Sequence, residues 1–417
     1  MARILPPSIS TPNTMRILWV KVGGLWPLNT GGRLRSFHIL RELSRRHRVT
    51  LLTTHGPEDD SEGLARNFPP DGRIVSFPYA APKQGSARFI RGLLRSWASP
   101  LPVDLWRWRV PALKRQVCRL IAGREIDLCV ADFLAAVPNV PRDASVPVVY
   151  FSHNVEHMIW QRLSRIEPRL WRRLLLEIEW RKMRRFESEA CARASLTVAV
   201  SEKDRDLLAS LARGANVTAI PTGVDTSYFM PNGTSEAAKT LVFSGSMDWY
   251  PNEDAVVYFM KEILPRIRRE IPAATLTVVG RNPRSELCAA AARAGVRVTG
   301  TVADVRPYLA EGEVYVVPLR VGGGTRLKIF EALAMGKAVV STGVGAEGLP
   351  LACGEHFLAA DDPEAFSQAV IRLLRNPEER RALGMAGRRL VEEGFSWLKV
   401  ARDFEAKCQE AMAIYAR

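Results

Sequence analysis

Hydrophobic and polar positions along the chain alternate between short apolar runs and longer segments with helical periodicity. The first run, "MRILWV", begins at Met15 and is followed by a glycine-rich loop. Apolar residues then recur at mostly three- and four-residue spacings over residues 34–43, before the next run, "VTLLTT". This order of strand, helix and strand is typical of a βαβ unit, so the pattern predicts a parallel sheet.

Both halves of the chain repeat this alternation. The further apolar runs are "IDLCVAD", "VPVVYFSHN" and "SLTVAVSE" in the first half, and "KTLVFSGS", "ATLTVVG", "VRVTG", "VYVVPL" and "KAVVST" in the second. The runs of the first half end in polar residues, as strands do when they deliver side chains to a site at their carboxyl edge. We therefore predict an α/β fold with two doubly wound, Rossmann-like domains that face each other across a cleft.

The boundaries follow from changes in composition. We expect a disordered lead-in over residues 1–14 and a first domain over residues 15–225. A linker segment rich in Pro and Gly, "IPTGVDTSYFMPNG", leads into a second domain over residues 226–394. Residues 395–417 have the apolar spacing of a long amphipathic helix. Periodicity leaves open whether this helix packs on its own domain or crosses back to the first.

Composition narrows the class of protein. The chain has 417 residues, enough for two domains, and no run of the roughly 18 apolar residues that a membrane span requires. Its N-terminus has no signal-peptide pattern, and its six cysteines are scattered without metal-ligand spacing. We therefore expect a cytoplasmic protein with reduced thiols.

The positive charge is concentrated in the first half. The net charge is +15, and residues 1–230 hold 35 Lys and Arg against 21 Asp and Glu, whereas residues 231–417 hold 24 against 23. Such an excess indicates an anionic partner for the first half, such as a membrane surface, a lipid phosphate or a nucleic acid. Plain solubility with an arginine-rich composition remains an alternative.

Two segments of the first half mix arginines with tryptophans and leucines, as interfacial helices do: "RFIRGLLRSW" and "RLWRRLLLEIEWRKMRRF". They favour peripheral attachment to the anionic inner face of a membrane, near a lipid-linked acceptor. The alternative is that these residues cover the core of their own domain.

The most specific motif is "VGGGTRLKIFEALAMGKAVV", which predicts a strand, a glycine loop and a helix over residues 326–335. The glycines let the main chain approach a ligand, and the first turn of a helix binds anions. Arg326 offers a planar fork and Lys328 a point charge to a diphosphate, while Glu331 could accept hydrogen bonds from a ribose. The motif therefore indicates a nucleotide site. A glycine-rich turn with a surface ion pair is the alternative.

The same motif carries a resemblance to a known family. From Gly322 to Leu349 the chain resembles retaining glycosyltransferases of the GT-B fold, in the large group called glycosyltransferase family 4. Matching segments are "TGGRLRS", "FSHNVEH", "IPTGVDTSYF", "GSMDWYPN" and the final "FSW". The chain is most similar to sugar transferases of bacterial exopolysaccharide gene clusters.

This resemblance implies that the second domain holds a nucleotide-sugar donor and the first a glycan or lipid-linked acceptor. Gly323 stands where the family has a second glutamate, and the usual Arg and Lys are missing from "GSMDWYPNEDAV". Arg326 and Lys328 are therefore expected to hold the diphosphate. The donor-binding residues that the resemblance implies are Gly245, Gly323, Gly324, Thr325, Glu331 and Gly345.

In the first domain the resemblance places His153 against the donor sugar, after a predicted strand, although a lone histidine is more often structural. The loop of Gly31 and Gly32, with Arg35 on the following helix, is expected to face the donor phosphates and the acceptor. A tight turn is the alternative for that loop. Glu156 is a candidate for positioning an acceptor hydroxyl, and His157 is expected to be structural.

Transfer of a sugar leaves charge on the departing diphosphate, which fixed donors and cations can stabilise. Because no D-x-D cluster follows a strand, we expect no metal and no cofactor. Two alternatives stay open: a GT-B-fold sugar-nucleotide epimerase, and a basic nucleic-acid-binding protein. For the second of these the chain shows no clear stacking platform or recognition helix, so we expect no nucleic-acid partner.

Overall fold

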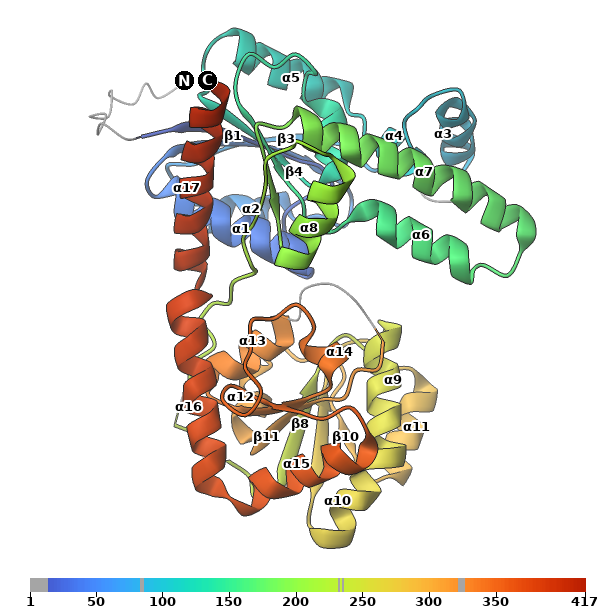
Figure 1. Cartoon of the computed structure of the whole chain (residues 1–417), viewed down its shortest axis with the longest axis vertical. Coiled ribbons are helices and arrows are strands. Elements are labelled where there is room, and N and C mark those ends of the chain that lie inside the picture. The colour runs from blue at the N-terminus through green and yellow to red at the C-terminus, as the bar shows by residue number, and fades with distance from the viewer. Residues whose placement is uncertain (1–13, 83–85, 232, 235, 322–326) are drawn as a thin grey trace. The chain divides into compact units, whose positions relative to one another are not determined.

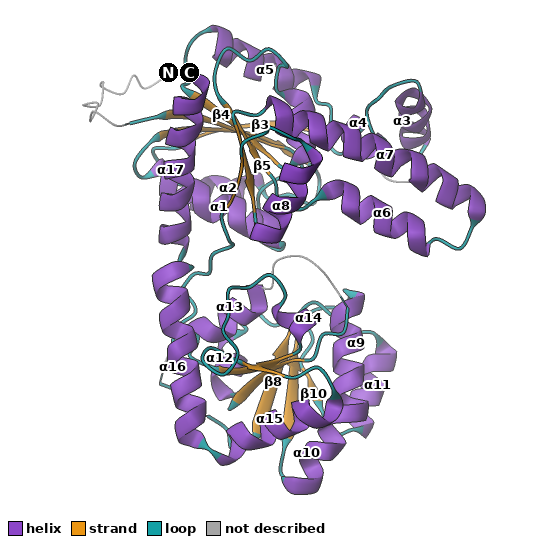
Figure 2. Cartoon of the chain, in the orientation of Figure 1, coloured by secondary structure: helices purple, strands orange, loops and turns teal. Residues whose placement is uncertain are grey.

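The chain forms two compact units, the first running to Pro221 and including Ala401–Arg417, the second comprising Thr222–Val400. The computed structural model describes residues 14–82, 86–231, 233–234, 236–321 and 327–417. The predicted lead-in lies outside these residues, except for Thr14. Figure 2 shows the strands of each unit at its centre, with helices around them.

The sheet of the first unit is entirely parallel, with the order β3-β2-β1-β4-β5-β6-β7. Its strands are β1 Arg16–Lys21, β2 Arg48–His55, β3 Arg73–Pro78, β4 Leu128–Asp132, β5 Val148–Phe151, β6 Leu196–Ala199 and β7 Val217–Ala219. Its helices are α1 Gly31–Ser44, α2 Ser61–Asn67, α3 Ala87–Trp97, α4 Val103–Trp106, α5 Pro111–Ala122, η1 Leu134–Asn139, α6 Glu156–Ile166, α7 Leu170–Arg193 and α8 Glu202–Leu211.

The second unit has a parallel sheet with the order β10-β9-β8-β11-β12-β13. Its strands are β8 Thr240–Ser244, β9 Thr275–Val279, β10 Arg297–Val298, β11 Val314–Val317, β12 Ala338–Ser341 and β13 Leu358–Ala359. Its helices are α9 Tyr250–Tyr258, the π-helical turn η2 Phe259–Ile263, α10 Leu264–Glu270, α11 Ser285–Arg293, α12 Arg306–Glu311, α13 Leu327–Ala334, α14 Gly343–Ala346, α15 Pro363–Arg375 and α16 Pro377–Gly394.

The apolar runs that predicted strands all form strands, and most of them supply buried side chains to the sheet of their unit, whereas the edge strand β10 is only partly buried. The four residues of β11 and the four of β12, for example, are all buried. The predicted α/β architecture is therefore confirmed. The short edge strands β7 and β13 and the partly exposed β3 were not predicted, since none of them carries a long apolar run.

Strand order reverses at one point in each sheet. In the first unit the chain builds outward from β1 to β3, then returns to place β4 on the other side of β1. In the second unit the chain builds outward from β8 to β10, then returns to place β11 on the other side of β8. In doubly wound sheets, ligands bind outside the carboxyl ends of the strands at such a switch point. Sites are therefore expected beside Lys21 and Asp132 in one unit, and beside Ser244 and Val317 in the other.

The last helix, α17 (Trp397–Tyr415), contributes to both units. Near its start, Trp397 packs so closely on Gly223 that a Cβ there would lie 2.6 Å from the indole. From Ala401 onward the helix belongs to the first unit. There the Phe404 ring lies 5.3 Å from that of Trp19 and 4.9 Å from that of Phe151, measured between centroids.

Candidate functional site

In the second unit, the predicted phosphate-binding helix is α13, which follows β11 at the switch point. Its apolar face is buried as predicted, with Phe330, Leu333 and Ala334 fully enclosed. Four predicted site residues precede it: Gly323, Gly324, Thr325 and Arg326. These four lie outside the residues that the structure describes. The site is therefore defined here by Lys328 and Glu331 and by their surroundings.

Lys328 lies at the carboxyl end of β8. Its Nζ donates to Oδ1 of Asn252 at 2.6 Å and lies 4.3 Å from the centroid of the Phe243 ring. The Asn252 amide in turn donates to the carbonyl of Ser246 at 2.8 Å, which fixes its orientation. The amide of Asn252 thus fixes the position of the ammonium group at the carboxyl end of β8.

Gly245 makes this contact possible. A Cβ at this position would lie 2.7 Å from Nζ of Lys328 and 2.7 Å from Nδ2 of Asn252, which is closer than such atoms can approach. The structure thus brings the predicted residue Gly245 together with Lys328. By contrast, Gly345 lies in α14, where a Cβ would lie 2.3 Å from the Ser341 hydroxyl, so it packs against the end of β12.

Glu331 lies one turn after Lys328, on the same side of α13. Burial raises the pKa of its carboxyl to about 7, although the charge on Lys328 acts in the opposite direction. A carboxyl in this state exchanges its proton near neutral pH, and when ionised it can accept two hydrogen bonds from neighbouring hydroxyls. This chemistry fits the predicted contact with a ribose.

In the first unit, the carboxyl ends of β1, β4 and β5 converge on Asp132. Its carboxylate accepts hydrogen bonds from Nε2 of His153 at 2.7 Å and from Nε1 of Trp19 at 2.9 Å, and it lies 3.3 Å from Nζ of Lys21. Burial alone would raise the pKa of the Asp132 carboxyl, but Lys21 and His153 outweigh this and hold it well below its usual range. Asp132 is therefore an ionised anchor for the histidine.

His153 is neutral in this setting. Burial lowers the pKa of its imidazole to about 4, despite the attraction of Asp132. Because Asp132 is ionised, we assign the proton to Nε2, which leaves Nδ1 as a hydrogen-bond acceptor. A neutral imidazole with a fixed acceptor suits contact with a sugar hydroxyl better than electrostatic stabilisation by a cationic ring.

Phe133 links His153 to the glycine loop. Its ring stacks on the imidazole at a centroid distance of 3.8 Å, and Nζ of Lys21 lies 4.2 Å from its centroid. Gly32 lies against the same ring, since a Cβ there would lie 2.3 Å from its edge. The structure thus brings Gly32 to the edge and His153 to the face of one aromatic side chain. Gly31 opens α1, just before Gly32.

Arg35, also predicted as a site residue, is almost completely enclosed, with 2% of its surface exposed. Its Nε and Nη2 find no hydrogen-bond acceptor among the described residues. Burial lowers the pKa of the guanidinium to about 9, while the charges of Asp204 and Asp132 act in the opposite direction. Unpartnered donors of this kind can bind an anionic group.

A pocket of ≈ 270 Å³ opens beside these residues and is bounded by the β1–α1 loop, α4 and the start of α6. Its lining residues include Lys21, Gly23, Gly24, Arg33, Asp104, Trp108, Phe133 and Glu156. Arg33 pairs with Asp59 at 2.6 Å, and Asp104 with Arg107 at 2.7 Å. Glu156 has no ion pair among the residues that the structure describes.

Surrounded by other acids, Glu156 is the carboxyl of this pocket that is most easily protonated. Burial, together with Glu187 and Asp104, raises its pKa to about 7. The neighbouring His157 contacts Glu187 through Nδ1 at 2.6 Å, and Glu187 also accepts the backbone N–H of Glu156 at 2.9 Å. His157 therefore has the structural role expected of it, at the start of α6.

Sequence reasoning missed Lys21, Asp132 and Asn252 as site residues. The first two end strands that meet at a switch point, so the rule on polar residues at strand ends could have singled them out. The contact between Asn252 and Lys328 spans 76 positions and left no signal in the sequence.

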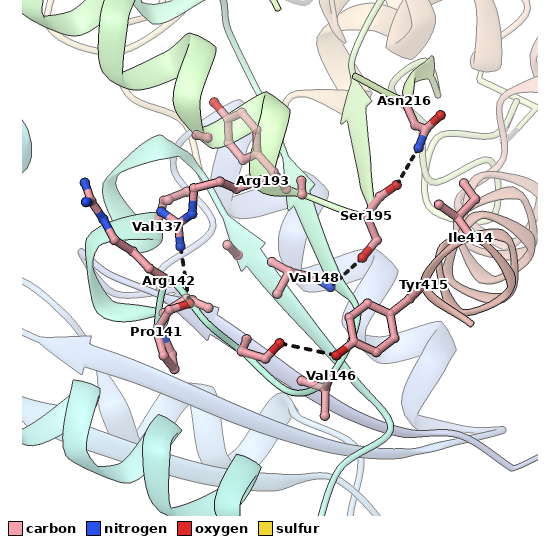
Figure 3. Close-up of a pocket in the computed structure, with 16 residues that line it drawn as sticks. Val137, Pro141, Arg142, Val146, Val148, Arg193, Ser195, Asn216, Ile414 and Tyr415 are labelled. Atoms are coloured by element: carbon pink, nitrogen blue, oxygen red, sulfur yellow. Dashed lines mark hydrogen bonds between the residues drawn. The ribbon is translucent and has the colours of Figure 1, made fainter. Parts of the chain in front are cut away.

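A second pocket of the first unit, of ≈ 260 Å³, lies elsewhere (Figure 3). Val148 and Ser195, at the amino ends of β5 and β6, line it together with Tyr415 of α17. Its lining is mostly aliphatic, and the guanidinium of Arg193 donates to the carbonyl of Pro141 at 3.3 Å. It is therefore at the edge of the sheet opposite to His153 and is not part of the candidate site.

Within the described part of the chain, no cluster of three or more His, Cys, Asp or Glu is arranged to hold a metal ion. In the same residues, no helix is both long and apolar enough to cross a membrane.

Two doubly wound parallel units, each with polar groups gathered at its switch point, define the GT-B class of α/β proteins. Solved structures share this fold. HepE from Anabaena, crystallised with UDP, superposes with a TM-score of 0.66 at 15% identity, covering 95% of this chain and 100% of that one.

Family comparison gives the finer placement. Residues 31–228 match the family described as "Glycosyltransferase Family 4", and residues 238–376 match "Glycosyl transferases group 1". Between them these matches cover most of the chain, which therefore belongs to this family of retaining glycosyltransferases. The family predicted from the glycine motif is thus confirmed.

Among curated relatives, a phosphatidyl-myo-inositol mannosyltransferase of Mycobacterium tuberculosis is 29% identical over 204 residues, which is 46% of this chain and 53% of the relative. A protein of the capsule (cps) region of Klebsiella pneumoniae is 21% identical over 169 residues, which is 38% of this chain and 43% of that protein. The matches thus span about half the length of these relatives.

Proposed function

We propose that the protein transfers a sugar from a nucleotide-diphosphate donor to a hydroxyl group of a glycan or lipid-linked acceptor, with retention of anomeric configuration. In this proposal the second unit binds the donor through Lys328 and Glu331, together with Arg326 and the glycine loop. The first unit contributes His153, the loop of Gly31 and Gly32, and the pocket beside Glu156.

One observation carries the donor assignment. A cation and a carboxyl lie one helical turn apart at the switch point of a GT-B-type sheet, with Gly245 leaving room for the cation. A diphosphate needs fixed positive charge, and a ribose offers a pair of hydroxyls to a carboxylate. The UDP bound to HepE, a structure of the same fold, supports a nucleotide ligand here.

We further propose a role in exopolysaccharide or other cell-surface glycan biosynthesis, on the cytoplasmic side of the membrane. The cps-region relative and the family branch indicated by the motif support this role. Lipid-linked acceptors lie at a membrane, so the proposal includes the anionic inner surface as a partner. It includes no metal, since diphosphate departure is assigned to Arg326, Lys328 and main-chain N–H groups.

The donor site is tested by the melting temperature of the full-length protein with a panel of nucleotide-sugars. The correct donor should raise it, because a ligand that binds only the folded state stabilises that state. Arg326→Ala, Lys328→Ala and Glu331→Ala should each weaken binding at least tenfold. The matched controls Lys261→Ala and Glu286→Ala, at exposed positions of the same unit, should bind as the wild type does. Intact binding in all three site variants would refute the assignment.

A sugar-nucleotide epimerase remains the rival activity, and acceptor dependence separates the two. A transferase consumes the identified donor only slowly unless an acceptor is present, whereas an epimerase converts the sugar nucleotide alone. NMR of the product then reports the anomeric configuration. Turnover to an epimeric sugar nucleotide without acceptor would favour the rival.

A further inference from the structure

A helical hairpin extends from the first unit and carries an exposed apolar surface. Helices α6 and α7 pack against each other and project away from the sheet (Figure 1). Along one side of α7, Leu170, Leu174 and Ile178 recur at four-residue spacing, with Trp171 beside them. Their exposed fractions are 80%, 63%, 42% and 61% respectively. We call these four residues the tip stripe.

Neighbouring helices also expose large apolar residues. On α6, Ile159 and Leu163 are 40% and 43% exposed, one helical turn apart. On α3, the exposed residues Ile90, Leu94 and Trp97 share one face, and α3 is held to α7 by a hydrogen bond from Lys182 to the carbonyl of Ser96 at 2.7 Å. Large apolar residues exposed together in this way mark an interaction surface rather than a solvated one.

Every exposed charged side chain between Glu156 and Arg193 is positive. The acidic residues of this segment are all buried or half-buried, and the exposed ones are Arg162, Arg165, Arg169, Arg172, Arg173, Arg181, Arg184 and Arg185. Arg181 pairs with Glu177 at 2.6 Å. The others form no ion pair with any residue that the structure describes. Exposed apolar side chains interspersed with arginines that form no ion pair are complementary to an anionic lipid surface.

We propose that the α6–α7 hairpin is a membrane-docking element whose tip stripe inserts among the lipids while its arginines bind their phosphate groups. This deepens the proposed function, on which its biological meaning rests, by assigning the membrane contact to a particular element. Apolar insertion and lipid phosphate binding act together, since neither a few side chains nor charge alone gives stable attachment.

The hairpin also sets the distance between the membrane surface and the pocket beside Glu156, the proposed acceptor site. Glu156, which lines that pocket, is the first residue of α6, and the eleven residues of α6 span about 16 Å. With the tip stripe in the bilayer, the pocket lies within roughly one helix length of the lipid surface. An acceptor sugar linked closely to its lipid can reach it, so we infer a short lipid-linked saccharide as the acceptor.

The test uses the full-length protein and sedimentation with vesicles of phosphatidylcholine alone or mixed with phosphatidylglycerol. Binding should require the anionic lipid and weaken as salt is raised. Leu170→Ser/Leu174→Ser should lower the partition coefficient at least tenfold. Arg169→Gln/Arg172→Gln/Arg173→Gln should lower it about fivefold for each arginine removed. The matched control Met385→Ser/Leu398→Ser replaces residues of the second unit that are 62% and 44% exposed and should bind normally.

The outcomes separate this proposal from the proposed function. Equal recovery with neutral and anionic vesicles, or unchanged binding in the tip double variant, overturns the docking proposal. A dimer in analytical ultracentrifugation that forms without lipid binding and is lost in Leu170→Ser/Leu174→Ser also overturns it, because a second copy would then cover the tip stripe. The melting shift with donor is measured on the same variants. If vesicles bind and no nucleotide-sugar does, only the proposed function fails.

Discussion

Burial and neighbouring charges give three carboxyl groups of the candidate site different protonation behaviour. Asp132 is kept ionised by Lys21 and His153, whereas the pKa values of Glu156 and Glu331 are raised to about 7. Carboxyls whose environments push their pKa values apart are typical of sites with distinct chemical roles. The ionised group anchors a histidine, whereas the carboxyls of Glu156 and Glu331 titrate near neutral pH.

Glu156→Gln should stabilise the fold at high pH while weakening use of the acceptor. The pKa of the Glu156 carboxyl rises from 4.5 to about 7 on folding, so the native state binds this proton more tightly than the unfolded state. The favourable contribution of this tighter proton binding to the free energy of unfolding is complete below pH 4.5 and is lost as pH rises through 7. Since glutamine stays neutral, the variant should gain about 2 to 3 kcal/mol in unfolding free energy by pH 8 and nothing at pH 4.

Urea denaturation across this pH range measures the gain, with Glu58→Gln at an exposed position as a control without effect. In transfer assays, wild-type kcat/KM for the acceptor should rise as pH passes 7, because the ionised carboxylate accepts the acceptor hydroxyl. In the variant this rise should disappear while donor affinity is kept. A variant with the wild-type pH profile would show that Glu156 does not contact the acceptor.

At the scale of elements, the first turn of α1 is fitted to the aromatic side chain that supports His153. The Phe133 ring cannot easily yield to a bulkier residue at position 32, since the imidazole stacks on it and Lys21 lies over it. The glycine loop and the histidine therefore form one packed layer at the carboxyl edge of the sheet, although they come from different elements.

Gly32→Ala should disturb this layer. The added Cβ would lie 2.3 Å from the Phe133 ring, and the necessary shift should cost about 1 to 3 kcal/mol in unfolding free energy. The control Gly394→Ala, at the end of α16 with no atom within 4 Å of its Cβ, should be neutral or slightly stabilising. Chemical denaturation gives both values. Equal stabilities of the two variants would mean that Phe133 moves aside freely.

Much of this element-level organisation could be predicted from the sequence. The apolar runs identified β1, β2, β4, β5, β6, β8, β9, β10, β11 and β12, and the helical spacing around Leu333 identified α13. For α7 the sequence favoured an interfacial surface but left a buried face as the alternative, because its leucines suit either. Periodicity indicates that a helix has an apolar side and does not say what covers that side.

At the scale of the whole molecule, each unit encloses its own core, yet the last helix belongs partly to each. Phe404, Cys408 and Ala411 are fully buried in the first unit, although the second unit precedes them in the chain. The ion pair of Arg46 with Glu405, at 2.6 Å, adds a polar contact to this packing. Residues 401–417, which follow the second unit in the chain, thus complete the core of the first unit.

Phe404→Ala should therefore destabilise the first unit, by about 3 to 5 kcal/mol, because it leaves a cavity against Trp19 and Phe151. Hydrogen exchange should show the loss in β1 and β5, with the amides of β8 and β11 unchanged. Leu398→Ala, at a position 44% exposed, is the control and should change neither group. Equal loss of protection in both units would show that they unfold as one.

The sequence by itself determined the α/β class, the family, and the placement of Lys328 and Glu331 one turn apart on a helix after a glycine loop. These features are local, because periodicity and spacing follow from neighbouring residues. Only the tertiary structure decided that Asn252 holds Lys328, that Asp132 fixes His153, and that the tip of α7 lies open to solvent. These features depend on which strands lie side by side and on how much hydration each side chain loses on burial. Parallel crossover connections bring together residues that no local sequence pattern relates.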